Sequence, residues 1–220
     1  AQTGQLCPGF GQGGYVSLLD GMGPPAPGLV FRAAPPTVVN GHIVLGAEGA
    51  DGAPSGVIRA FDAVTGQLQW AWDLGRPDRK GAPEPGGRYT PGVPAAAAAF
   101  AADPQLNLVY VPTGNAAPAF FGGKRRAFDD AYSSAVVAID LTSGWARWSF
   151  QTTRHDLWGY DLTAQPVLAE LPGPEGAVPV LIQATRRGDV FVLDRRDGRP
   201  IVPVREHAVG QDGVDGERPS

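Results

Sequence analysis

A turn signature of the form Asp-x-x-x-Gly-x-x-x-Trp repeats along the chain and limits its fold more than any other feature. The signature is complete at residues 62–70 and 140–148, keeps Asp194 and Gly198 but has Val202 in place of the Trp in a third copy, and survives in part at residues 2–6. Asp can accept hydrogen bonds from the amides of the turn that follows it, and Gly supplies a positive φ at the corner. Each copy therefore predicts a β-hairpin.

Hairpins of this kind cannot bury both of their faces alone and must stack on neighbouring copies. The chain holds 31 Gly and 22 Pro in 220 residues, a turn-dense composition that favours many short strands. Further strands are predicted at residues 37–45, with an Asn-Gly turn, and at 107–111 and 180–183. Residues 74–95 and 112–131 are long insertions, and 94–99 has the propensity for one helical turn. We therefore expect an all-β fold.

The charge pattern argues against nucleic-acid binding, because the formal net charge is −4 and both signs are interspersed. The one short basic run, residues 124–126, is interpreted as a solvated loop tip. Cys7 is the single cysteine, so no intrachain disulfide can form. No signal-peptide pattern is visible at the start, and the most apolar stretch, residues 94–102, is shorter than a membrane span.

Several segments carry a resemblance to the membrane-bound glucose dehydrogenases that use pyrroloquinoline quinone (PQQ). They are residues 54–62, 132–134, 150–152, 155–158, 165–166 and 192–198, together with 3–7 and 10–11 near the start. The resemblance implies an eight-bladed β-propeller with tryptophan-docking repeats. Residues 1–220 would form one partial propeller domain of about three to four blades, and the remaining blades would be needed to close the ring.

The resemblance also implies a chemistry. PQQ would sit on the propeller axis with Ca²⁺ or Mg²⁺, a carboxylate would remove the alcohol proton of a sugar or alcohol substrate, and electrons would pass to ubiquinone or another quinone. The full-length protein would then be periplasmic and membrane-associated.

The site residues that the resemblance implies are only partly present. Arg186 matches the basic residue beside the quinone, although it is alternatively one of two turn arginines. The catalytic Asp, which in this family follows the His-Asp-Leu-Trp stretch, is matched by Gly159, which cannot accept a proton. The metal-binding Asn and the stacking Trp of the family are matched by Ala95 and Ala97, and Glu48 is only a distant match for a metal-binding Glu.

Two carboxylates flank Gly159 and are the candidates for a displaced base, namely Asp156 and Asp161. Their alternative role is capping of turns and strand ends, which we favour because a base displaced by about 1 Å can lose two orders of magnitude in rate. His155 is interpreted as a packed, hydrogen-bonded histidine rather than a metal ligand. Two functions stay open at this stage: a PQQ-dependent dehydrogenase, and a non-catalytic propeller that serves as a scaffold or binding module.

Overall fold

The computed structural model describes residues 4–24, 27, 33–47, 55–92, 94, 96–174, 176–210 and 212–217. Three antiparallel sheets contain the strands, and each sheet is built from strands that follow one another in the chain. The first sheet comprises β1 (Thr37–Val39), β2 (His42–Leu45), β3 (Ile58–Asp62) and β4 (Leu68–Trp72). The second comprises β5 (Ala101–Asp103), β6 (Leu108–Pro112), β7 (Ala135–Asp140) and β8 (Ala146–Gln151). The third comprises β9 (Val167–Gly173), β10 (Gly176–Ala184) and β11 (Val190–Asp194).

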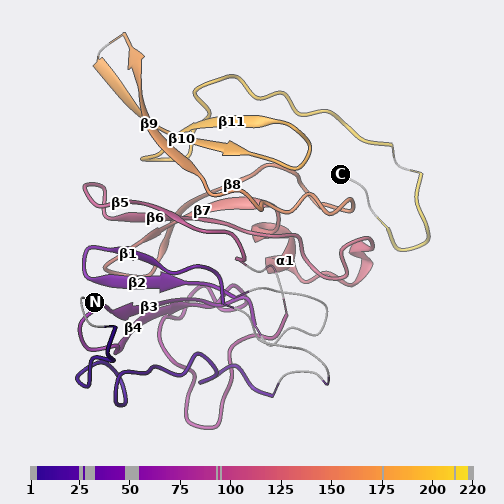
Figure 1. Cartoon of the computed structure of the whole chain (residues 1–220). Helices are drawn as coiled ribbons and strands as arrows, with labels where there is room; N and C mark the ends of the chain where they lie inside the picture. Colours follow the sequence, from indigo (N-terminus) through magenta and orange to yellow (C-terminus); the bar gives the residue numbers. More distant parts are fainter. Residues whose placement is uncertain are drawn as a thin grey trace.

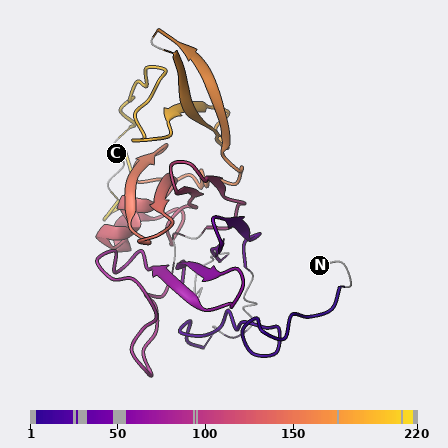
Figure 2. The same cartoon turned by 90° about the vertical axis from the view of Figure 1, so that its left-hand side faces the viewer.

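The sheets stack face to face in chain order, as Figures 1 and 2 show. One apolar core lies between the first and second sheets, where Ile58 and Ala60 meet Val109 and Val137. A second core, which includes Tyr110 and Leu181, lies between the second and third sheets. Stacked four-stranded antiparallel sheets are the blades of a β-propeller, so the all-β prediction is confirmed.

The repeated signature behaves as its local chemistry predicts. The Asp62 carboxylate accepts hydrogen bonds from the amides of Val64 at 2.9 Å and Thr65 at 2.6 Å, and Asp140 and Asp194 accept equivalent bonds. The glycines at 66, 144 and 198 all have a φ between 71° and 77°. Both Trp residues fall on the strand after the turn, in β4 and β8. The hairpin at 37–45 also forms, with its turn at Asn40 and Gly41.

Each Trp crosses to the next sheet, and this contact joins neighbouring blades. The Trp70 ring covers Gly144 so closely that a Cβ built on that glycine would lie 2.7 Å from Trp70 Cβ and Cγ. The Trp70 indole also donates a 2.7 Å hydrogen bond from Nε1 to the Leu141 carbonyl oxygen. Trp148 covers Gly198 in the same way. A glycine is required at these corners both for its positive φ and for the space that the indole fills.

The third sheet lacks a described fourth strand. On the side of β11 away from β10, pairing in the described residues is limited to a bridge between Leu193 and Pro200 and a 2.8 Å bond from Ile201 N to Val192 O. The long insertion before β7 contains a 3₁₀ turn, η1 (Gly122–Lys124), and a short helix, α1 (Ala127–Tyr132), which the sequence did not predict. Residues 96–99 form no helical turn. Within the described ranges, no helix has the length and apolar character needed to cross a membrane.

Candidate active site

The structure brings three of the predicted site positions together, namely Gly159, Asp161 and Arg186. Gly159 lies in the segment that follows β8, and Arg186 lies in the turn between β10 and β11. The Arg186 Nη1 atom donates to the Gly159 carbonyl oxygen at 3.0 Å and to the Asp161 Oδ2 atom at 3.2 Å. The Arg186 side chain is 55% exposed. Gly159, the position matched to the family's base, and Arg186, the position matched to its basic residue, therefore lie side by side in loops that follow the second sheet and join two strands of the third.

Asp161 joins three loops rather than standing free. Its Oδ1 atom accepts a 2.7 Å hydrogen bond from the Asn115 amide, in the loop after β6, while Oδ2 holds Arg186. Both carboxylate oxygens therefore already carry a donor. These contacts connect Asp161 to two other loops, and both its capping role and its role as a base stay predictions.

Asp156 is fully buried and is surrounded by donors. Its carboxylate accepts from the Ser134 hydroxyl at 2.6 Å and from the amides of Trp158 at 2.9 Å and Tyr160 at 2.7 Å. The two amides belong to the turn that carries Gly159, so Asp156 fixes the path of that turn. These contacts are those of a turn cap, and proton transfer by Asp156 stays a prediction as well.

Gly159 has a φ of +73°, in the left-handed region that side chains rarely adopt. A Cβ built there would meet only the exposed ring of Phe120, at 3.5 and 3.7 Å. Space for a larger side chain is therefore available, whereas an L-residue with this backbone costs about 1–2 kcal/mol. Asp and Asn tolerate this conformation better than most residues.

The positions matched to the metal and the stacking ring give no support for a cation site. Ala97 is exposed, and Ala95 and Glu48 lie outside the described residues. In the part of the chain that the structure describes, no group of three or more His, Cys, Asp or Glu side chains is arranged to hold a metal ion. The two nearby carboxylates already bind Arg186 and backbone amides, so this donor set does not fit Ca²⁺ or Mg²⁺.

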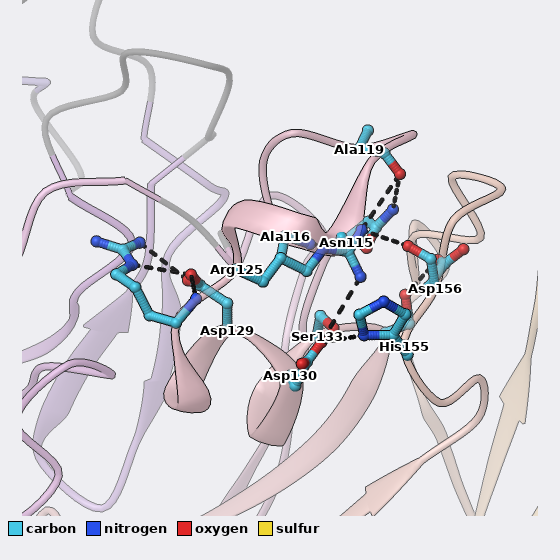
Figure 3. Close-up of polar contacts among 12 residues, drawn as sticks. Asn115, Ala116, Ala119, Arg125, Asp129, Asp130, Ser133, His155 and Asp156 are labelled. Carbon is cyan, nitrogen blue, oxygen red and sulfur yellow. Dashed lines mark hydrogen bonds and ion pairs between the residues drawn. The ribbon is translucent and has the colours of Figure 1, made fainter. Parts of the chain in front are cut away.

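A buried arginine behind the site was missed by sequence reasoning. The Arg125 side chain has no exposed surface, so the interpretation of residues 124–126 as a solvated loop tip is wrong for Arg125. Figure 3 shows its guanidinium reaching between the insertion and the Gly159 segment. Nη2 donates to Asn115 Oδ1 at 3.3 Å, to Ala119 O at 3.2 Å and to the Asp156 carbonyl oxygen. Arg125 thus connects the insertion before β7 to the segment that carries Asp156 and Gly159. No local sequence pattern predicts this contact.

His155 lies beside this cluster, with a φ of +40° and a mostly buried ring. Its Nδ1 atom lies 2.9 Å from Asp130 Oδ1, as Figure 3 shows, and its Nε2 atom lies 3.5 Å from Glu217 Oε1. The Glu217 carboxylate in turn accepts from the Gly122 amide at 2.9 Å. This arrangement matches the packed, hydrogen-bonded histidine that we expected, and it connects α1, η1 and the C-terminal segment.

Comparisons with known proteins agree with this fold. Residues 1–220 match the family described as "PQQ: Glucose/ethanol/alcohol dehydrogenase, beta-propeller domain". Over 219 residues the chain is 48% identical to the glycerol dehydrogenase large subunit of Gluconobacter oxydans, covering 97% of this chain and 30% of that protein. It is 40% identical to quinoprotein glucose dehydrogenase A of Acinetobacter calcoaceticus, with coverages of 96% and 27%.

The solved structure of quinohemoprotein alcohol dehydrogenase from Comamonas testosteroni is similar over 84% of this chain and 30% of that chain. The TM-score is 0.60 and the sequence identity is 28%. The chain thus spans about a third or less of the length of these relatives. Because the family match extends over all 220 residues and agrees with three stacked propeller blades, the chain belongs to the β-propeller family of PQQ-dependent glucose, ethanol and alcohol dehydrogenases.

Proposed function

We propose that this chain supplies three blades of a PQQ-dependent dehydrogenase of sugars or alcohols, in which Arg186 donates to the quinone cofactor. The names of the relatives, a glycerol dehydrogenase large subunit and a quinoprotein glucose dehydrogenase, support a polyhydroxy substrate. By the same resemblance, the complete protein would pass electrons to ubiquinone or another quinone at the periplasmic side of a membrane. PQQ, when bound, supplies the two-electron oxidant.

One observation carries this proposal: Arg186 is held beside the matched base position by two contacts that both use Nη1. A guanidinium has five N–H donors, so Nε and Nη2 are left to bind quinone or carboxylate oxygens. Asp161 and the Gly159 carbonyl oxygen orient the fork, and the half-exposed side chain keeps it accessible. The role of this chain's residues would be to hold and orient the cofactor.

A second candidate function is a non-catalytic propeller, and Gly159 favours it. The matched base position has no side chain, and the flanking carboxylates are already bonded to Arg186 and to backbone amides. The described residues also offer no metal site. A stack of blades that kept its docking Trp residues but lost the base and the metal ligands would act as a scaffold or binding module.

PQQ titration separates the two candidates. The complete protein, in which the remaining blades close the ring around the propeller axis, would be titrated with PQQ, with and without Ca²⁺ or Mg²⁺, and binding followed by quenching of Trp fluorescence. Dye reduction with glucose, glycerol and ethanol would follow. No binding at micromolar PQQ would refute the dehydrogenase assignment. Steady turnover would refute the non-catalytic assignment and would require a base outside Gly159.

A matched pair of arginine variants tests the role of Arg186. Arg186→Gln should weaken PQQ binding by about tenfold or more, because a hydrogen bond to a charged group contributes about 1.5–3 kcal/mol. Arg187→Gln is the control, since Arg187 pairs with Asp189 at 3.2 Å and lies over the Tyr160 ring. Equal losses in both variants would contradict a specific role for Arg186.

A further inference from the structure

A line of hydrogen bonds runs from the buried Arg125 to Arg186 in the candidate active site. Arg125 follows η1, and its side chain has no exposed surface. Its Nη2 atom donates to Asn115 Oδ1 at 3.3 Å, and the Asn115 backbone amide donates to Asp161 Oδ1 at 2.7 Å. The other oxygen of that carboxylate accepts from Arg186 Nη1 at 3.2 Å. Arg125 and Arg186 are therefore connected through only two residues.

A second line of hydrogen bonds reaches Arg186 through the turn that contains Gly159. The same Nη2 atom of Arg125 donates to the Asp156 carbonyl oxygen, as Figure 3 shows. The Asp156 carboxylate accepts from the two backbone amides that flank Gly159. The Gly159 carbonyl oxygen is the other acceptor of Arg186 Nη1, at 3.0 Å. Arg125 thus holds both of the segments whose oxygens orient Arg186.

The remaining donors of Arg125 are poorly satisfied. Its Nε and Nη1 atoms are buried, and neither has a hydrogen-bond partner among the described residues. The Asp130 carboxylate lies 3.7 Å from Nη1 and also contacts His155. Leaving buried donors unpaired costs free energy, which offsets the bonds that Nη2 makes. We therefore expect Arg125 to contribute more to the placement of the two segments than to the stability of the fold.

We propose that Arg125 is a positioning residue for Arg186 and thereby sets the affinity of the site for its quinone cofactor. This inference rests on the proposed function, in which Nε and Nη2 of Arg186 donate to PQQ. The Arg186 side chain is 55% exposed, so the two oxygens that hold Nη1, more than packing, define where its planar fork points. A donor that is already oriented binds more tightly, because less side-chain freedom is lost on binding. Without Arg125 the two segments can separate, and the fork loses its direction.

A double-mutant cycle on the complete protein tests the proposal, with the Kd for PQQ as the measured quantity. Arg125→Met removes the guanidinium and keeps an apolar chain. It should raise the Kd about tenfold in the otherwise unmodified protein and less than about twofold in Arg186→Gln, where the fork is already absent. Lys124→Gln is the matched control, because Lys124 is the exposed cation next to Arg125, and it should leave the Kd unchanged. Equal losses from Arg125→Met in both backgrounds would indicate a purely structural role and would overturn the proposal.

Hydrogen exchange in the cofactor-free protein gives a second readout that needs no PQQ. Arg125→Met should speed exchange of the Asn115 and Tyr160 amides, which bond to carboxylates on the two segments, and Lys124→Gln should not. Unchanged exchange of both amides in Arg125→Met would overturn the proposal, because the two segments would then be held without Arg125.

The cycle also separates this proposal from the proposed function. A weaker PQQ affinity in Arg186→Gln without a loss in Arg125→Met would overturn the positioning role alone. An unchanged affinity in Arg186→Gln would overturn the role of Arg186 and the positioning role together. If Arg125→Met does not fold, Asn115→Ala takes its place in the cycle with the same expected and contradicting results. That variant removes the oxygen that Arg125 contacts and keeps the backbone amide that holds Asp161.

Discussion

The Trp70–Gly144 contact gives the sharpest test of how these blades are joined. Gly144→Ala adds one methyl group at a corner whose φ is +71°. The new Cβ would lie 2.7 Å from Trp70 Cβ and Cγ and 2.9 Å from Cδ2. Trp70 is 1% exposed and anchored by its indole hydrogen bond to Leu141, so it cannot move aside freely. The clash must therefore be relieved by separating the first two sheets.

The expected loss in the free energy of unfolding has two contributions, one from the backbone and one from packing. An alanine in the left-handed region costs about 1–2 kcal/mol relative to glycine. Overpacking a filled core costs about 1–3 kcal/mol more. Gly144→Ala should thus lower the free energy of unfolding by about 2–5 kcal/mol. Gly41→Ala isolates the first part, because Gly41 has a φ of +77° and nothing lies within 4 Å of its built Cβ.

Urea denaturation followed by Trp fluorescence measures both variants, since the denaturation midpoint and slope give the free energy of unfolding. We expect Gly41→Ala to lose about 1–2 kcal/mol and Gly144→Ala to lose clearly more. Equal losses in the two variants would refute the argument that the Trp70 ring occupies the space a side chain would need. A gain in stability for Gly144→Ala would refute both the expected backbone cost and the expected packing cost.

Three further predictions use the same measurement. Trp70→Phe should destabilise the chain by about 1 kcal/mol more than Trp148→Phe, because only Trp70 loses an indole hydrogen bond, and equal losses would contradict this. Asp156→Ala should lower the free energy of unfolding by about 2–4 kcal/mol because it leaves buried donors unpaired, and a neutral effect would contradict the capping role. The side-chain hydrogen bond from Arg196 lowers the pKa of Asp194, so its stabilising effect is present above the unfolded pKa of about 3.9 and is lost as pH falls through the lower folded value. Asp194→Asn should remove this acid dependence of the urea midpoint, and an unchanged pH profile would contradict the assignment.

The turns and strands could be predicted from the sequence because the interactions that make them are local. Asp62 bonds to amides two and three residues ahead, and Gly66 supplies the positive φ one residue further on. Those contacts need no information from the rest of the fold. The destination of Trp70 could not be predicted in the same way, because Leu141 is 71 residues away and only the stacking of two sheets brings them together.

The candidate site was less predictable for the same reason. Arg125 sits in a basic run that looks solvated, yet its guanidinium is buried against the Asp156 carbonyl oxygen, 31 residues further along. Gly159 looks like a simple loss of a base, whereas its φ of +73° shows that the backbone there also favours glycine. The sequence could indicate candidate positions but not which partners already contact them.

The two Trp contacts are also less equivalent than their shared signature indicates. Trp70 donates to the carbonyl oxygen of Leu141, the residue after the Asp of the next repeat. The residue in that place for Trp148 is Arg195, and its carbonyl oxygen accepts instead from the Tyr110 hydroxyl at 2.8 Å. Trp148 Nε1 is buried without a partner. Both Trp rings therefore pack on a glycine of the next repeat. At the second interface, however, the backbone carbonyl is bonded by Tyr110 and not by the indole.

Arg195 explains how the second interface is stabilised without that indole bond. Its Nε atom lies 2.6 Å from Asp103 Oδ2, and its Nη2 atom lies 2.8 Å from Glu170 Oε1. Asp103 belongs to β5 of the second sheet and Arg195 follows β11 of the third, so a largely buried ion pair joins the two blades. Removing one partner of such a pair is strongly destabilising. Both interfaces thus contain an apolar core, and the second adds a largely buried ion pair where the first has an indole hydrogen bond, although one repeated signature builds both.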